Sequence, residues 1–314
     1  RDFGMGKKSI EEKINEECDY LVQVFKSYKG KSFENTMIMN SAVANIIVSI
    51  LLNHRFDYED PTLLKLISLV RENVRLLHIQ MVLMYNSYPN LMSWLPGVSQ
   101  YHLLETQRQM QSFIKDTFTQ RKQLDVNDPR DLIDVFLVKQ KEEKPSPVMY
   151  FHNQNLISLV DNLFVAGMET TSTTLRWGLL LMMKYPEIQR NVQKEIEKVI
   201  GSAQPRSENR KQMPYTDAVI HEIQRFGNIV PSNVMHATTR DVTFKGYFIP
   251  KGTQVMPLLT SVLQDKSEGH LKNEAFIPFS AGRRSCVGEI LAKMELFLFF
   301  TKLLQNFTFQ APPG

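Results

Sequence analysis

One cysteine near the C-terminal end of the chain stands in a setting that suits ligand or nucleophile chemistry. The run FSAGRRSCVGE, residues 279–289, places Cys286 between two glycines and just after two arginines. An apolar pattern of helical period follows from Ile290 to Leu304. The positive end of a helix dipole and neighbouring guanidinium groups both favour a thiolate over a thiol. The pattern therefore predicts a site that presents a sulfur anion.

Several kinds of site compete for such a cysteine. A lone cysteine is often a small buried apolar residue, and a thiol-nucleophile enzyme is a further alternative. A Cys-x5-Arg phosphatase loop needs an arginine at position 292, which is Ala292. A zinc site needs more ligands than one cysteine with scattered histidines, and the chain has no Cys-x-x-Cys. A thiolate is also a strong electron-donating axial ligand for haem iron.

A second polar cluster lies inside the longest apolar pattern, His152 to Tyr185. Its centre reads AGMETTSTT, residues 166–174. Glycine costs about 1 kcal/mol relative to alanine in a helix, and β-branched residues lose side-chain freedom there. A carboxylate and hydroxyls in a buried helix need hydrogen-bond partners, and hydroxyls that bond to the preceding turn can open the helix locally. The cluster predicts a functional segment; the alternative is a set of small residues at a helix crossing.

Three motifs in a fixed order give a resemblance to a known family. They are Phe-x-x-Gly-x-Arg-x-Cys-x-Gly at 279–288, Ala-Gly-x-Glu-Thr-Thr at 166–171, and Glu222-x-x-Arg225 between them. Together they resemble the cytochrome P-450 monooxygenases, and the local sequence is similar to that of the microsomal family-two members. The resemblance extends over essentially the whole chain. It implies a mainly α fold with a small β portion, as one domain over residues 1–314.

The resemblance also implies a role for individual residues. Cys286 is expected to be the axial thiolate ligand of the haem iron, framed by Phe279, Gly282 and Gly288. The haem propionates are expected to bond Arg284 and His236, while Ala166 and Gly167 leave room above the haem. Thr170 with Glu169 is expected to steer water and protons to the oxygen site. The remaining implied roles are a buried pair, Glu222 and Arg225, that locks the haem-binding loop, and a substrate pocket lined by Phe164, Ile229, Val230 and Val234.

The implied activity is that of an oxidoreductase. One oxygen atom of O2 enters a lipophilic molecule (a fatty acid, a steroid or a xenobiotic). The electrons come from an NADPH-dependent flavin reductase, with a cytochrome b-type donor as a second source. The implied location is the cytosolic face of the endoplasmic reticulum membrane. The alternative is a truncated, catalytically inert haem-binding or interaction variant.

The composition agrees with a folded enzyme. The 314 residues are 43% hydrophobic and 22% charged, which is enough apolar material for a large core. The two cysteines, Cys18 and Cys286, cannot form a disulfide framework, so a reducing compartment is expected. A net charge of +4 suits an acidic partner or an anionic membrane surface, but it is too small to indicate nucleic-acid binding.

Helical periodicity dominates the elements that must position these residues. A shift toward period two between Asn228 and Leu263 predicts short strands. The helices are expected at Ile10–Tyr28, Thr36–Leu52, Pro61–Leu77, Tyr101–Gln123, Pro129–Lys141, His152–Tyr185, Pro186–Ile200, Met213–Phe226 and Ile290–Leu304. Because it is apolar nearly all round, the helix from His152 is expected to be buried on all sides.

The chain departs from the family pattern in three places. The membrane anchor and the last strands are expected to be missing at the two ends. An internal deletion is expected between Leu263 and Phe276, where the family carries a longer stretch that braces the Glu222–Arg225 pair.

An aromatic loop around residues 88–97 is expected either to touch a membrane surface or to pack over the core.

Overall fold

The computed structural model describes residues 8–77, 88, 100–119, 128–145, 149–264 and 276–312, with side chains of 100–104 and 117–119 left aside. The chain divides into two compact units, Arg1–Ser172 and Thr173–Gly314, which are described here one at a time. The predicted aromatic loop, apart from Tyr88, and the predicted deletion at 265–275 lie outside the described residues.

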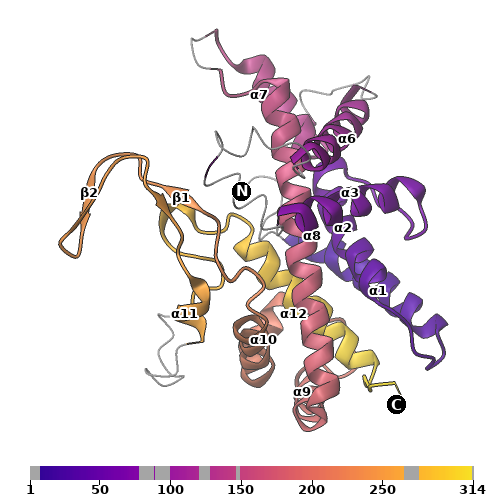
Figure 1. Ribbon diagram of the computed structural model, residues 1–314. Coiled ribbons are helices and arrows are strands. Elements are labelled where there is room, and N and C mark those ends of the chain that lie inside the picture. Colours follow the sequence, from indigo (N-terminus) through magenta and orange to yellow (C-terminus); the bar gives the residue numbers. More distant parts are fainter. Residues whose placement is uncertain are drawn as a thin grey trace. The chain divides into compact units, whose positions relative to one another are not determined.

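The first unit is helical (Figure 1). Its elements are α1 (Lys8–Ser27), α2 (Thr36–Leu52), α3 (Pro61–Leu77), α6 (Gln100–Thr119), α7 (Leu132–Glu142) and the first part of α8 (Asn153–Lys184). In α1 an apolar stripe of Ile14, Leu21 and Phe25 is at most 5% exposed, and α1 packs against α2. α2 in turn contacts α3 and α7, and it is buried along most of its length.

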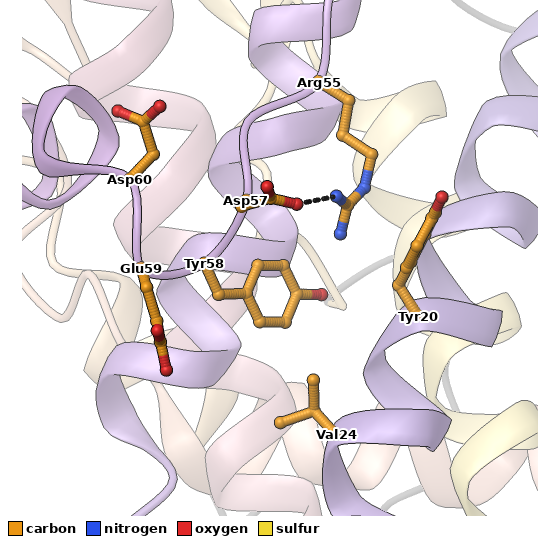
Figure 2. Close-up of a pocket in the computed structure, with 7 residues that line it drawn as sticks. All are labelled: Tyr20, Val24, Arg55, Asp57, Tyr58, Glu59 and Asp60. Atoms are coloured by element: carbon orange, nitrogen blue, oxygen red, sulfur yellow. Dashed lines mark ion pairs between the residues drawn. The ribbon is translucent and has the colours of Figure 1, made fainter.

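A buried carboxylate fastens α1 to α2 and to the loop that leads into α3. Glu17 accepts hydrogen bonds from Tyr58 Oη at 2.5 Å, Arg55 Nε at 2.8 Å and Asn45 Nδ2 at 3.4 Å. Burial raises the pKa of the Glu17 carboxyl, and these bonds oppose that shift. Figure 2 shows Arg55 reaching between Asp57 and Tyr20, whose ring lies 3.6 Å from the guanidinium carbon. The pocket at this place is lined mostly by charged and aromatic side chains, and none of the predicted site residues belongs to it.

The second unit is built around α12 (Glu289–Asn306), which packs against α9 (Pro186–Val199) and α10 (Pro214–Gly227). Phe297, Phe299 and Phe300 of α12 are each at most 2% exposed. A Cβ added at Gly178 of α8 would lie 3.2 Å from the Phe300 ring, so a small residue permits this close packing. The Glu195 carboxylate of α9 accepts from the backbone N–H groups of Tyr215 and Thr216 at 3.1 and 2.7 Å, which satisfies the N-terminus of α10.

Two small antiparallel sheets complete the second unit. The strand β1 (His236–Ala237) pairs with β4 (Gln254–Val255), and β2 (Val242–Phe244) pairs with β3 (Tyr247–Ile249). Lys245 and Gly246 join β2 to β3 with φ of 48° and 83°. Two successive positive φ values are typical of a hairpin turn that matches the twist of its strands. The predicted small β portion is confirmed.

The remaining short elements of this unit are α11 (Leu259–Leu263) and the 3-10 helices η1 (Ser207–Gln212) and η3 (Gly282–Arg284). The predicted helices are found with small shifts at their ends: α7, for example, begins at Leu132, where Asp131 caps it by accepting from Asp134 N at 3.0 Å. Among the described helices, none is both long and apolar enough to cross a membrane.

Candidate functional site

Cys286 is exposed in a loop that leads directly into α12. Its backbone N–H donates to Phe279 O at 3.0 Å, so the loop closes on itself around the cysteine. Ser280 and Gly282 have φ of 62° and 79°, in the left-handed region that glycine adopts freely. Gly288 precedes α12, and a Cβ added there would lie 3.8 Å from the Cys286 sulfur. The glycines therefore shape the loop, and the sulfur reaches solvent.

A hydrogen bond joins this loop to the segment before β1. Asn233 Nδ2 donates to Ser280 Oγ at 2.9 Å, and Asn233 itself has a φ of 56°. His236 follows three residues later, half-buried in β1, where it pairs with Val255. Its Nδ1 is buried and has no hydrogen-bond partner among the described residues. An unsatisfied buried ring nitrogen costs free energy unless a ligand or water bonds it.

The residues of the second unit fit a haem group. A haem needs an axial ligand, apolar contacts for its ring and donors for its propionates, and Cys286 supplies the accessible sulfur. Val234 and Val287 are 70% and 81% exposed, and both stand within or next to the two joined segments. His236 Nδ1 offers an unused polar atom, and Arg284 is exposed with no ion pair in the described part of the chain. The donor set agrees with the implied cofactor.

The polar cluster of α8 shows hydroxyls bonded back along the helix. Thr170 Oγ1 donates to Ala166 O at 2.6 Å, and Ser172 Oγ donates to Glu169 O at 3.3 Å. α8 nevertheless stays continuous from Asn153 to Lys184, so the hydroxyls do not open the helix. The expectation of a local opening is wrong at the level of the backbone.

One face of α8 is open rather than buried. Asn162 and Ala166 are exposed, and Thr170 is half-exposed one turn further on. These three residues lie four apart and so share one side of the helix. Val160, Phe164 and Met168, which occupy the opposite side, are at most 3% exposed. Within the first unit, the described residues therefore bury one side of α8 and leave this face open, although the apolar pattern predicted burial on all sides.

Two predicted residues of α8, Gly167 and Phe164, lie against neighbouring side chains. A Cβ added at Gly167 would lie 2.7 Å from Ile47 Cδ1, so this glycine leaves room for the close approach of α2. Phe164 is 2% exposed on the packed side of α8, away from the open face. Ala166 lies on the open face, as its predicted role requires.

Glu169 is half-buried and is approached from α2. Asn40 Nδ2 donates to Glu169 Oε2 across 3.5 Å, a long hydrogen bond. Glu169 and Thr170 belong to the first unit, whereas Cys286, Arg284 and His236 belong to the second. The predicted site residues therefore form two groups, one in each unit.

Glu222 and Arg225 form a two-point ion pair on α10. Arg225 Nε and Nη2 each donate to a different Glu222 oxygen at 2.7 Å. The predicted burial of this pair is wrong: the Glu222 side chain is 57% exposed and that of Arg225 is 27% exposed. The buried stripe of α10 runs through Thr216, Ile220 and Ile223, which leaves Glu222 on the outer side.

Arg225 also has a third partner. Its Nη1 donates to Leu263 O at 3.2 Å, and the His221 ring meets the Phe276 ring edge-on with centroids 4.9 Å apart. One turn of α10 therefore holds the chain on both sides of residues 265–275. The sequence predicted the loss of the family's brace, but it gave no sign that the Leu263 carbonyl and Phe276 would contact α10.

The residues predicted to line a substrate pocket differ in exposure. Ile229 is half-buried, whereas Val230 and Val234 are 37% and 70% exposed. All three belong to the segment that Asn233 ties to the cysteine loop.

Sequence reasoning missed two residues whose side chains join separate segments: Asn40, which contacts Glu169, and Asn233, which contacts Ser280. The signal for Asn40 was an amide inside an apolar helix, while Asn233 had no signal because a single loop asparagine is common.

Comparisons with known proteins agree with these features. The sequence model described as Cytochrome P450 matches residues 1–268 and 265–314, in two segments that meet where the deletion is predicted. The chain is 48% identical to Cytochrome P450 2K1 of Oncorhynchus mykiss over 335 aligned positions, which cover 100% of this chain and 66% of that protein. Since the chain has 314 residues, at least 21 of those positions face residues that it lacks.

Two rabbit proteins give a similar result. Cytochrome P450 2C14 of Oryctolagus cuniculus is 46% identical over 98% of this chain and 66% of its own length. Cytochrome P450 2B4 of the same species is 45% identical over 99% of this chain and 67% of its own length. The chain thus spans about two thirds of the length of these relatives.

Proposed function

The chain belongs to the cytochrome P450 family, and from this premise we propose that it carries the haem-thiolate centre of a monooxygenase that hydroxylates lipophilic molecules. The observation that carries the proposal is the exposed Cys286 in a loop that Asn233 joins to the segment before His236, whose Nδ1 has no hydrogen-bond partner among the described residues. In the reaction, a C–H bond, O2, two electrons and two protons give an alcohol and water.

When bound, haem would supply the iron at which O2 is reduced, and a thiolate ligand would donate electron density to that iron. In this proposal Cys286 is that ligand. Arg284 and His236 bond the propionates, and Phe279, Gly282 and Gly288 shape the loop around the sulfur. The accessible Sγ and the unpartnered Nδ1 of His236 support these roles.

The two protons are handled by residues on the open side of α8. Thr170 Oγ1 donates to Ala166 O, and because a hydroxyl also accepts hydrogen bonds, it can receive one proton while it gives up another. Glu169 holds and releases a proton at Oε2, within reach of bulk water because it is only half-buried. Proton transfer by a positioned side chain typically contributes a rate factor of about 10² to 10⁴.

The proposed substrates are fatty acids, steroids or xenobiotics that contact Ile229, Val230 and Val234. The electron donor is an NADPH-dependent flavin reductase, with a cytochrome b-type protein as a second donor, at the cytosolic face of the endoplasmic reticulum. Arg283 of the cysteine loop is exposed, which supports docking of an acidic partner.

The test is reconstitution of the expressed chain with haem, the reductase and NADPH, followed by product analysis with one substrate from each class. We expect hydroxylated product that requires both NADPH and the reductase. Thr170→Val is expected to consume NADPH with little product. Stoichiometric haem binding without any product from the three classes would contradict the monooxygenase assignment.

A catalytically inert haem-binding variant is the second candidate. The observations that favour it are the exposed Glu222–Arg225 pair and the residues that the chain lacks relative to the 2K1 protein. This candidate predicts haem binding without turnover, so the same reconstitution separates the two.

A further inference from the structure

Asn40 is a buried amide in an otherwise apolar part of α2. It is 0% exposed, and its Oδ1 has no hydrogen-bond partner among the described residues. Burying an amide without full hydrogen bonding costs about 1–3 kcal/mol, so an apolar residue at this position would favour folding. The other buried asparagine of α2 has a local explanation, since Asn45 bonds both the N–H and the C=O of Phe56.

The same face of α2 meets α8 at two points within the proposed proton-handling segment. Ile47 Cδ1 fills the space left by Gly167, and Asn40 Nδ2 donates to Glu169 Oε2 at 3.5 Å. Asn40 and Ile47 are seven residues apart, which places them two turns apart on one side of the helix. The contact between Ile47 and Gly167 therefore sets the spacing of α2 and α8, and this spacing sets how closely Asn40 approaches Glu169.

An amide can bond a carboxyl group in both of its protonation states. A carboxylate accepts from the amide N–H, and a protonated carboxyl donates to the amide oxygen after the amide turns over. Asn40 has this second atom available, because Oδ1 is unpartnered while Nδ2 faces Glu169. A leucine or a methionine could fill the same space but could bond neither state.

We propose that Asn40 is a positioning residue that holds the Glu169 side chain in both protonation states while protons pass to the open face of α8. The proposal rests on the proposed monooxygenase function. Removal of the amide should leave the fold and haem binding in place. It should also loosen Glu169, so that fewer of the electrons taken from NADPH appear in product and more appear in hydrogen peroxide.

The test compares Asn40→Leu, Asn40→Gln and Ser41→Ala, the last as a control that removes a neighbouring buried polar group of α2. Two readouts are taken on haem-loaded protein. One is the product formed per NADPH consumed. The other is the infrared carboxyl bands of Glu169, identified by subtracting the spectrum of Glu169→Gln. The second readout needs no turnover, so it remains informative if the monooxygenase function itself fails.

We expect Asn40→Leu to lower product per NADPH at least threefold and to shift the Glu169 bands. Asn40→Gln should recover at least half of the coupling, and Ser41→Ala should match the wild type in both readouts. Unchanged Glu169 bands and coupling in Asn40→Leu would overturn the proposal. If Asn40→Leu does not bind haem, Asn40→Ala replaces it, because it removes both polar groups of the amide and adds neither bulk nor charge; the same two outcomes then decide.

Discussion

At the scale of single residues, the proposed chemistry depends on few side chains, and each has a distinct physical setting. Cys286 is exposed in a loop, Thr170 is bonded to its own helix, and Glu169 is contacted from a neighbouring helix. In the proposed function, the thiol acts as a ligand, the hydroxyl as a proton relay and the carboxylate as a proton store. Each role can be removed by one substitution that leaves the backbone unchanged.

Thr170→Val tests the relay. Valine keeps the β-branched shape but loses the hydroxyl that donates to Ala166 O. We expect product formation per NADPH consumed to fall at least tenfold, because the proposed relay loses the group that would pass the proton. Thr170→Ser keeps the hydroxyl and should stay within threefold of the wild type. Equal coupling in the valine and serine variants would remove Thr170 from the proton path.

Glu17 gives a pH dependence that belongs to stability and not to activity. Burial raises the pKa of its carboxyl above the ordinary 4.5, so the folded chain binds this proton more tightly than the unfolded chain. Its contribution to the free energy of unfolding is therefore fully present below pH 4.5 and declines as the pH rises through the folded pKa. The decline cannot exceed about 1.4 kcal/mol per pH unit.

The measurement is urea unfolding of the wild type and Glu17→Gln at several pH values from 4.5 to 8. The stability of the wild type relative to Glu17→Gln should decrease as the pH rises. Glu16→Gln, at an exposed position of the same helix, controls for the loss of one negative charge. A relative stability that increases with pH would show that the Arg55 and Tyr58 bonds outweigh burial.

At the scale of elements, α8 shows how far sequence patterns lead. Its length and its apolar composition were predictable, because a run without breakers continues from His152 to Tyr185. Its open face was not predictable, because periodicity shows which residues are apolar but does not show which neighbouring elements cover them. Gly167 illustrates the same limit, because no local pattern indicated that Ile47 of α2 would lie against it.

Gly167→Ala tests this packing. The new Cβ would lie 2.7 Å from Ile47 Cδ1. Overpacking costs about 1–3 kcal/mol, which exceeds the gain of about 1 kcal/mol in helix propensity. We expect a lower free energy of unfolding in urea. Ile47→Val removes the clashing methyl group, so in that background Gly167→Ala should cost less than half as much. Equal costs in the two backgrounds would place the strain elsewhere.

Other elements were predictable in part. The α10 ion pair was expected from Glu and Arg three residues apart, and it is formed. Its exposure depends on which side of α10 meets α9 and α12, and that side is marked by Ile220 and Ile223. The hydrogen bond from Asn233 to Ser280 joins residues 47 positions apart, and no local pattern encodes such a contact.

At the scale of the whole molecule, the chain carries the family's motifs on two compact units and spans about two thirds of the length of its relatives. Its net charge of +4 is small, so attraction of the proposed reductase would have to come from local clusters. The cysteine loop supplies one. Arg283 is exposed there without an ion pair in the described residues, whereas Lys293 of α12 is paired with Glu289 Oε1 at 2.5 Å.

Charge reversal tests the proposed docking. Arg283→Glu should slow reduction by the flavin reductase about three- to tenfold at low salt, and the effect should shrink at high salt. Lys293→Glu should have a smaller effect, because Glu289 already offsets its charge. Lys251→Glu, in an exposed turn outside the cysteine loop, makes the same change of net charge and should leave the rate unchanged. Equal slowing by all three variants would indicate net charge and not a docking site.

The most direct test of the central claim is the reduced, carbon-monoxide difference spectrum of the expressed chain with haem. We predict the red-shifted Soret band of a thiolate-ligated haem in the wild type and in Cys18→Ala, which alters the other cysteine. Cys286→Ser should lose this band. A wild-type band at the position of a neutral ligand, or a red-shifted band that persists in Cys286→Ser, would contradict the assignment of Cys286 as the haem ligand.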